Sequence, residues 1–288
     1  MNDIKKLAVV LLLLCADIAC TEQEADITPQ VRLSTSDQSW RQWKLPKRLN
    51  EISGLAFTSD DRLLAVNDEE AIIYEIDYDS GRLVKQFALG KPVLRGDFEG
   101  IAYFEGRVFL VTSDGLLFKA NEGADGEQVR FQKFDTGIGK ECELEGLAQD
   151  VERRRLLLIC KNMADNDVAL TVFVWLLDDD RIDGDQQFEL PVSDIMMRLK
   201  TKSLHPSGIA IHPSTGSLLI VAARQRAVVE LNQDGSLIDV IITPSGKRHR
   251  QPEGIEISRT GKLIIADEGG NSRARLTVYS SVGRVDND

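Results

Sequence analysis

Apolar residues along the chain fall into short runs separated by polar turns. Val, Ile and Leu crowd the runs, for example Leu63–Val66 and Ile72–Ile76, while Gly, Asp and Ser fill the gaps, as in Asp79-Ser-Gly81. Runs of this length and composition predict β-strands, and the 3.6-residue spacing of amphipathic helices is missing from them. The pattern therefore predicts an all-β protein.

The runs are organised by an internal repeat. Five segments share one shape: Glu51-Ile-Ser-Gly-Leu55, Asp97-Phe-Glu-Gly-Ile101, Glu143-Leu-Glu-Gly-Leu147, His205-Pro-Ser-Gly-Ile209 and Gln251-Pro-Glu-Gly-Ile255. Their glycines lie 46, 46, 62 and 46 residues apart. Each glycine opens one apolar run, and three further runs follow it in most units. Four short antiparallel strands at this period are typical of a β-propeller blade.

The two ends of the chain predict how the ring closes. The fifth unit has only three runs before the chain ends, and Trp40–Leu45 lies ahead of Gly54 where other units place their fourth strand. Pairing these segments would remove two open sheet edges. We therefore expect one propeller domain over residues 38–282, with five blades of four antiparallel strands closed by an N-terminal strand, and a polar tail over 283–288. A sixth, degenerate blade inside the long third unit is the alternative.

The extra 16 residues of the third unit fall in two places. Asn162–Val168 is predicted to be a polar loop, and Ser193–Leu204 a short surface helix. An insertion on one face of a propeller can shape a binding pocket or cover a rim.

The first residues have the pattern of an export signal. Lys5 and Lys6 precede the uncharged run Leu7–Ala16, which is too short to span a bilayer. Cys20 follows Ala19, as at a bacterial lipoprotein processing site, so we expect a signal over 1–20 and a polar tether over 21–37. Simple cleavage and release, or an uncleaved anchor, are the alternatives. The predicted location is the periplasmic side of the cell envelope, with lipidated Cys20 as the membrane anchor.

Export also permits disulfides. Once the signal is set aside, Cys142 and Cys160 remain, and they flank a turn-like stretch centred on Val151. Folding the flanking runs into a hairpin places the two cysteines opposite each other. A disulfide and two free buried thiols both remain open.

Composition and charge narrow the partners. The chain has 288 residues, of which 42% are hydrophobic and 28% charged, and its formal net charge is −11. No run rich in Lys and Arg stands out. This balance argues against nucleic acid or an anionic membrane surface as the main ligand. A monomer is expected, held to the membrane by its lipid alone.

The candidate site lies where the propeller brings the repeats together. The residue before each repeat glycine should approach the axis: Ser53, Glu99, Glu145, Ser207 and Glu253. Other polar residues of the same funnel are Glu51, Asp68, Asp97, Lys161, His205, Arg224, Asp267 and Glu268. Converging carboxylates need a cation, basic partners or raised pKa values.

Three interpretations of this funnel remain open. The first is a Ca²⁺ site made by Glu99, Glu145, Glu253, Asp68 and Asp267, because hard cations prefer such oxygen ligands. The second is a ring of ion pairs with Lys161 and Arg224. The third is structural: each Glu or Ser bonds backbone groups of the neighbouring blade and holds the ring together.

Signals for catalysis are sparse. The sequence contains no G-x-S-x-G elbow, no phosphate-binding Walker loop and no H-x-x-x-H zinc spacing. Only His205 is placed as a candidate base, and His212 is expected to be a solvated turn residue. The catalytic residues are therefore unknown, and binding is favoured over catalysis.

Several ordered motifs resemble the SdiA-regulated (YjiK-like) family over residues 45–280: Glu51-Ile-Ser-Gly-Leu-Ala56, Val66-Asn-Asp68, Asp97-Phe-Glu-Gly-Ile-Ala102, Leu144-Glu-Gly-Leu-Ala148 and Gln251-Pro-Glu-Gly-Ile255. The resemblance implies an exported or membrane-associated bacterial propeller. It extends to phytase-like and esterase-like propellers, some of which hold calcium in the funnel. Here Ala222-Ala-Arg224 and Lys161-Asn162 depart from the acidic pattern of the family.

Two functional hypotheses follow. The leading one is a non-enzymatic propeller that binds a small molecule or an envelope protein at its funnel. The alternative is a calcium-assisted hydrolase, phytase-like or lactonase-like, in which the funnel carboxylates hold the cation.

Overall fold

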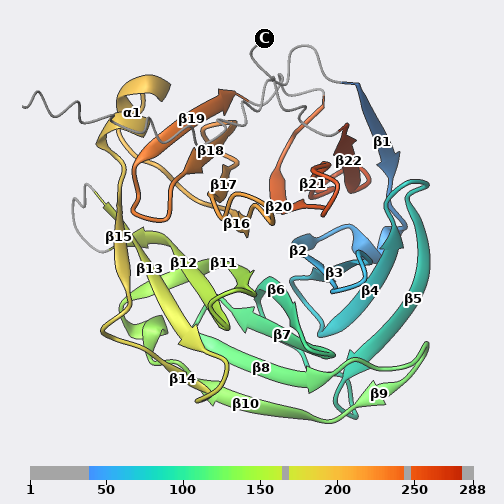
Figure 1. Cartoon of the computed structure of the whole chain (residues 1–288). Helices are drawn as coiled ribbons and strands as arrows, with labels where there is room; N and C mark the ends of the chain where they lie inside the picture. Colours follow the sequence, from blue (N-terminus) through green and yellow to red (C-terminus); the bar gives the residue numbers. More distant parts are fainter. Residues whose placement is uncertain (1–38, 164–168, 243–247, 281–288) are drawn as a thin grey trace, which may run out of the picture.

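The computed structural model describes residues 39–163, 169–242 and 248–280. Five antiparallel sheets surround a central axis, and the chain passes from one to the next in sequence order (Figure 1). This confirms the predicted five-bladed propeller, and the six-bladed alternative is wrong. The extra residues of the third unit include helix α1 (Ser193–Leu199), which confirms the predicted short helix.

The blades contain the following strands. Blade 1 has β2 (Ile52–Phe57), β3 (Leu63–Asn67), β4 (Ile72–Asp77) and β5 (Arg82–Leu89). Blade 2 has β6 (Phe98–Phe104), β7 (Arg107–Thr112), β8 (Leu116–Asn121) and β10 (Phe131–Asp135). Blade 3 has β11 (Cys142–Asp150), β12 (Arg155–Met163), β13 (Ala169–Leu176), β14 (Arg181–Ile182) and β15 (Phe188–Pro191). Blade 4 has β16 (Gly208–Ile211), β17 (Leu218–Ala222), β18 (Ala227–Leu231) and β19 (Leu237–Ile242). Blade 5 has β20 (Pro252–Ile257), β21 (Leu263–Asp267), β22 (Arg275–Tyr279) and β1 (Trp40–Lys44).

A few short elements lie outside the four-strand pattern. Strand β9 (Gln128–Val129) adds to blade 1 parallel to β5, and both β14 and β15 pair with β13. Two 3₁₀ turns, η1 (Lys47–Leu49) and η2 (Ile138–Lys140), precede the inner strands of blades 1 and 3.

Ring closure follows the prediction. Strand β1 runs antiparallel to β22, with Trp40 opposite Tyr279 and Lys44 opposite Arg275. The N-terminal strand thus completes the blade made by the C-terminal strands, and no edge of the ring is left open between them.

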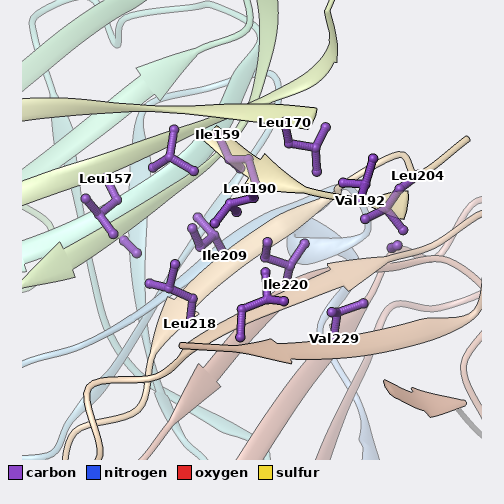
Figure 2. Packing of buried hydrophobic residues seen from close by; sticks show 14 of the residues in the cluster. Leu157, Ile159, Leu170, Leu190, Val192, Leu204, Ile209, Leu218, Ile220 and Val229 are labelled. Atoms are coloured by element: carbon purple, nitrogen blue, oxygen red, sulfur yellow. The ribbon is translucent and has the colours of Figure 1, made fainter. Parts of the chain in front are cut away.

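The hydrophobic core is divided into layers between neighbouring blades. Figure 2 shows the layer between blades 3 and 4, where Leu157 and Ile159 of β12 face Ile209, Leu218 and Ile220 of β16 and β17. Helix α1 contributes its fully buried side chain Ile195 to the same layer. The insertion therefore covers the rim of an interblade layer.

The repeat glycines hold the inner strands close together. A Cβ at Gly100 would lie 2.7 Å from the backbone nitrogen of Leu147, and one at Gly208 would lie 2.4 Å from the carbonyl oxygen of Glu253. Each glycine thus meets the inner strand of the next blade. The requirement at these positions is the missing side chain, because any Cβ would push two blades apart.

Cys142 and Cys160 form a disulfide with a Cα–Cα distance of 5.8 Å. The two residues are not directly opposite, because Cys142 pairs with Met163 and Cys160 with Leu144. Irregular register on both sides of Leu144 shifts the ladder, so the bridge crosses it diagonally.

Candidate functional site

The residues before the repeat glycines lie at β-bulges. The register skips one residue between Ile52 and Gly54, between Phe98 and Gly100, and between Pro252 and Gly254. The skipped residues are Ser53, Glu99 and Glu253, and the irregular part of β11 contains Glu145. A bulge re-aims a side chain relative to the regular pleat. Ser53, Glu99 and Glu253 line a narrow cavity of about 10 Å³ at the channel.

The axial carboxyls are destabilised in their charged form. Burial, followed by repulsion from Glu145 and Asp97, raises the pKa of Glu99 to about 9. Burial and repulsion from Glu145 raise the pKa of Glu253 to about 8. Both side chains therefore carry a proton at neutral pH.

Glu145 has the basic partner that the other two lack. The Lys161 ammonium contacts the Glu145 carboxylate directly and lies 3.5 Å from Glu143. For Glu145, burial raises the pKa, and this effect is larger than the opposite effect of the nearby Lys161 ammonium. For Lys161, burial lowers the pKa, but the carboxylates around it have the larger combined effect, so its pKa is raised. Arg224 is exposed, and within the described ranges it forms no ion pair. The predicted ring of ion pairs is thus reduced to the group around Lys161.

Further carboxyls form the outer rim of the funnel. Burial and repulsion from Glu51 raise the pKa of Asp68 to about 6, and they also raise that of Glu268. The Ser113 hydroxyl donates to Asp97 over 2.6 Å. Nine carboxyl residues act on one another in this way: Glu51, Asp68, Glu69, Asp97, Glu99, Glu143, Glu145, Glu253 and Glu268. The funnel is therefore acidic, with far fewer cations than carboxyl groups.

Asp267 is not part of the open funnel. Its carboxylate is 1% exposed, lies 2.7 Å from Nδ1 of His249, and accepts a hydrogen bond of 2.8 Å from the backbone of Arg250. Nε2 of His249 contacts the Tyr279 hydroxyl at 2.6 Å. Both carboxylate oxygens are thus engaged inside blade 5. The sequence placed Asp267 by its position after the second strand, but side-chain direction depends on the strand pleat.

The structural interpretation applies to one repeat position. The Ser207 hydroxyl donates to the carbonyl oxygen of Pro252 in the next blade over 2.8 Å and accepts from the Ala223 N–H. In the described part of the chain, the Ser53 hydroxyl and Nδ1 of His205 are buried without a hydrogen-bond partner. Burial and the nearby Arg224 lower the pKa of His205, so its ring is neutral at physiological pH.

The side chains do not form a ready calcium cage. Across residues 39–163, 169–242 and 248–280, no three His, Cys, Asp or Glu side chains converge closely enough to hold a metal ion. Of the proposed calcium ligands, Glu145 is already paired with Lys161, and Asp267 points away from the funnel toward His249. The donor set therefore fits Ca²⁺ poorly in this arrangement.

Sequence reasoning missed a larger cavity at the other mouth of the channel. About 490 Å³ in volume, it is lined by the last residues of all five inner strands, among them Phe57, Tyr103, Gln149, Ile211 and Ile257. His212 lines it and is 6% exposed, so the expectation of a solvated histidine was wrong. The sequence feature that could have indicated this cavity is the residue two positions after each repeat glycine. That residue is alanine in four units and Glu256 in the fifth.

No helix in the described ranges is long and apolar enough to cross a bilayer. The predicted signal, Cys20 and the tether lie outside the described residues, as do 164–168 of the predicted loop and 281–282 at the end of the predicted domain.

Solved structures with the same fold are distant in sequence. A glutaminyl cyclase from Myxococcus xanthus is 15% identical, with a TM-score of 0.55, covering 83% of this chain and 93% of that one. A luciferin-regenerating enzyme is 11% identical, with a TM-score of 0.50, covering 85% of this chain and 96% of that one. At these identities the likeness concerns the fold alone.

A family model narrows the assignment further. The model described as SdiA-regulated matches residues 39–268, which include all five inner strands and the whole acidic funnel. Together with the repeat motifs and the five-bladed fold, this match shows that the chain belongs to the SdiA-regulated family.

Proposed function

We propose that this protein is a binding protein of the cell envelope that captures a cationic group, on a small ligand or on a partner protein, at its acidic funnel. The observation that carries the proposal is the pair Glu99 and Glu253. Both are largely buried at the channel without a basic partner of their own, and their pKa values are raised to about 9 and about 8. A bound cation would stabilise the ionised form of both carboxyls, which burial and mutual repulsion disfavour.

The charge balance of the funnel supports a cation over an anion. Lys161 is already paired with Glu145, and the carboxyl groups of Asp97, Glu99 and Glu143 act on that pair as well. An anionic ligand would meet repulsion from the carboxyl groups of blades 1, 2, 3 and 5, and only the side of blade 4 carries the exposed Arg224. A nucleophile paired with a base was not found in the sequence, so capture without turnover is the simpler function.

Location rests on the N-terminal sequence. The run before Cys20 supports export and lipid attachment, which would hold the propeller at the periplasmic side of a membrane. If so, replacing Cys20 with Ala should move the protein from the membrane fraction to the soluble periplasm. Unchanged membrane association would contradict the anchor.

The binding experiment is calorimetric titration of the full chain with spermidine at pH 6, 7.5 and 9. The double variant Glu99→Gln/Glu253→Gln should weaken binding by about tenfold, the equivalent of about 1.4 kcal/mol. In the unaltered protein affinity should rise with pH, because the two carboxyls must release protons to pair with the cation. Glu256→Gln is the matched control, since it alters a buried carboxyl at the other mouth.

Equal affinity in the double variant, or no spermidine binding at all, would overturn the proposal. A Lys-rich peptide used in the same titration separates the two sources of the cation. Tighter binding of the peptide favours a partner protein, and tighter binding of spermidine favours a small ligand.

A calcium-assisted hydrolase is the second candidate. The observation that favours it is the mutual repulsion of the carboxyls Glu99, Glu145 and Glu253, which a bound Ca²⁺ would neutralise. Titration with calcium chloride decides between the two. Calcium binding that is lost in the double variant, together with hydrolysis of p-nitrophenyl phosphate or acetate, would support the hydrolase. The absence of calcium binding would count against it.

A further inference from the structure

The cavity opposite the funnel is a separate space. Its walls come from the ends of the five inner strands, whereas the funnel carboxyls come from their beginnings. Between the two lie the residues directly after the glycines, Leu55, Ile101, Leu147, Ile209 and Ile255, each at most 4% exposed. A volume of about 490 Å³ lies within the range of small-molecule sites.

Glu256 breaks the repeat at this cavity. The same position in the other four units is Ala56, Ala102, Ala148 and Ala210, all of them buried. A small side chain suits a position where neighbouring inner strands approach closely. Glu256 is only 6% exposed and lines the cavity, so the fifth unit places a carboxyl where packing alone calls for a methyl group.

Among the residues that the structure describes, no Lys or Arg side chain acts on the Glu256 carboxyl. It accepts a hydrogen bond of 2.9 Å from the backbone N–H of Ile257, and the backbone of Phe57 also contributes. Burial raises its pKa to about 8, against the smaller effect of these backbone bonds. At neutral pH the group therefore carries a proton and acts as a hydrogen-bond donor.

His212 supplies a second neutral donor. Its Nδ1 accepts from the backbone N–H groups of Ser214 at 3.2 Å and Thr215 at 3.4 Å. Burial lowers the pKa of His212, so the ring is neutral and its proton lies on Nε2. The walls are partly aromatic, with Phe57, Tyr103 and Phe104 each at most 7% exposed.

The charged groups around the cavity are paired with one another or exposed. Asp150 bonds to Arg155 at 2.9 Å and lies 3.4 Å from Arg153, while Arg154 lies 2.7 Å from Glu105. The side chains of Glu152 and Arg259 are exposed. None of these charged groups contributes to the raised pKa of Glu256. The cavity thus offers neutral donors and apolar walls, and the buried carboxylate Asp150 in its lining is paired with Arg155.

We propose that this cavity binds a small, uncharged, partly aromatic molecule whose carbonyl or amide oxygen accepts hydrogen bonds from Glu256 and His212. A charged amine would have to expel the proton of Glu256, and it would relieve no repulsion between carboxyls as it would at the funnel, because no other carboxyl of the described residues acts on Glu256. A carboxylate would bury an unpaired negative charge in a space whose donors are neutral. The aromatic walls bury the apolar part of the ligand. The inference does not depend on what the funnel binds.

The test uses three matched probes on the full chain at pH 7: 3-phenylpropanamide, 3-phenylpropylamine and 3-phenylpropanoate. Binding is followed by calorimetry and by ligand-detected NMR. The amide should bind at least about tenfold more tightly than either charged probe. A charged probe must change the protonation state of Glu256 or bury its own charge, and a change of one pKa unit corresponds to a tenfold change in affinity.

Two variants localise the effect. Glu256→Ala should fold, because alanine occupies this position in the other four blades, and should weaken amide binding about tenfold. Glu256→Gln should retain binding, because a carboxamide still donates. The funnel variant Glu99→Gln/Glu253→Gln is the control and should bind the amide normally.

The pH profile gives an independent readout. Amide binding to the unaltered protein should weaken as pH rises through about 8, while binding to Glu256→Gln should not, because only the glutamate loses its proton there. Failure of the amide to bind, preference for a charged probe, or equal binding by Glu256→Ala would each overturn the proposal. A flat pH profile in the unaltered protein would do so even if the alanine variant failed to fold.

Discussion

At one mouth of the channel, several carboxyl groups lie within range of one another and share a single paired lysine. At the other mouth, Glu256 is buried beside aromatic and neutral polar groups, and the other charged groups of that cavity are paired with one another or exposed. Burial raises the pKa at both mouths, but at the funnel repulsion between carboxyls adds to it. The comparison indicates that one fold can offer a cation-seeking site and a neutral donor site at opposite ends of the same strands.

The largest expected effect concerns the disulfide, which cross-links the first and second strands of blade 3. Replacing both Cys142 and Cys160 with Ser should lower the free energy of unfolding by about 3 kcal/mol, because the bridge closes a loop of about 18 residues. Urea unfolding measures the loss, and dithiothreitol should reproduce it in the unaltered protein. A loss well below 1 kcal/mol in both experiments would mean that the bridge contributes little to the funnel end.

The next effect concerns pH and the funnel carboxyls. A carboxyl whose pKa is raised on folding stabilises the protein fully below its unfolded value of 4.5, and that stability is lost as pH rises toward about 9 for Glu99. Glu99→Gln/Glu253→Gln should therefore be more stable than the unaltered protein at pH 8, by about 2 kcal/mol, with a smaller difference at pH 5.

Urea unfolding of both proteins at the two pH values measures this difference, and Glu256→Gln provides the comparison from the other mouth. No other carboxyl in the described part of the chain contributes to the raised pKa of Glu256, so the Glu256→Gln substitution should give a smaller gain in the free energy of unfolding at pH 8. The same gain for the double variant at pH 5 and pH 8 would contradict the raised pKa values.

The smallest effect contrasts one ion pair at each mouth. Lys161→Met removes the partner of the buried Glu145 and should cost about 1 kcal/mol at neutral pH. Arg154→Ala removes an exposed pair with Glu105 and Asp178 at the cavity rim and should leave stability unchanged within error. Thermal unfolding at low and high salt compares them. Equal losses in the two variants would remove this distinction between the mouths.

Strand composition and the spacing of the repeat glycines were sufficient to predict the blades and the closing strand. These features are local or periodic, so they can be recognised without knowing which residues meet. The funnel carboxyls Glu99, Glu145 and Glu253 could be predicted as a group for the same reason. The bulges that re-aim them could not, because the register of a ladder depends on both strands.

Asp267 and Glu256 show the limits of the same reasoning. Asp267 follows a second strand as expected, yet its carboxylate contacts His249, which lies between blades 4 and 5 in the chain. Glu256 was visible as a departure from alanine, but its meaning depends on a cavity made by five strand ends. Such a cavity exists only after the ring has closed.

The sequence by itself determined the all-β class, the five repeats, the closing strand and the acidic character of the funnel, because strand periodicity and repeated motifs are properties of the linear chain. Only the tertiary structure decided which carboxyls are paired, which face the channel, and that a second cavity lies at the opposite mouth. The pairs form across neighbouring strands, as between Glu145 and Lys161, which are 16 residues apart in sequence, and the funnel and the cavity form only when the blades pack around the axis.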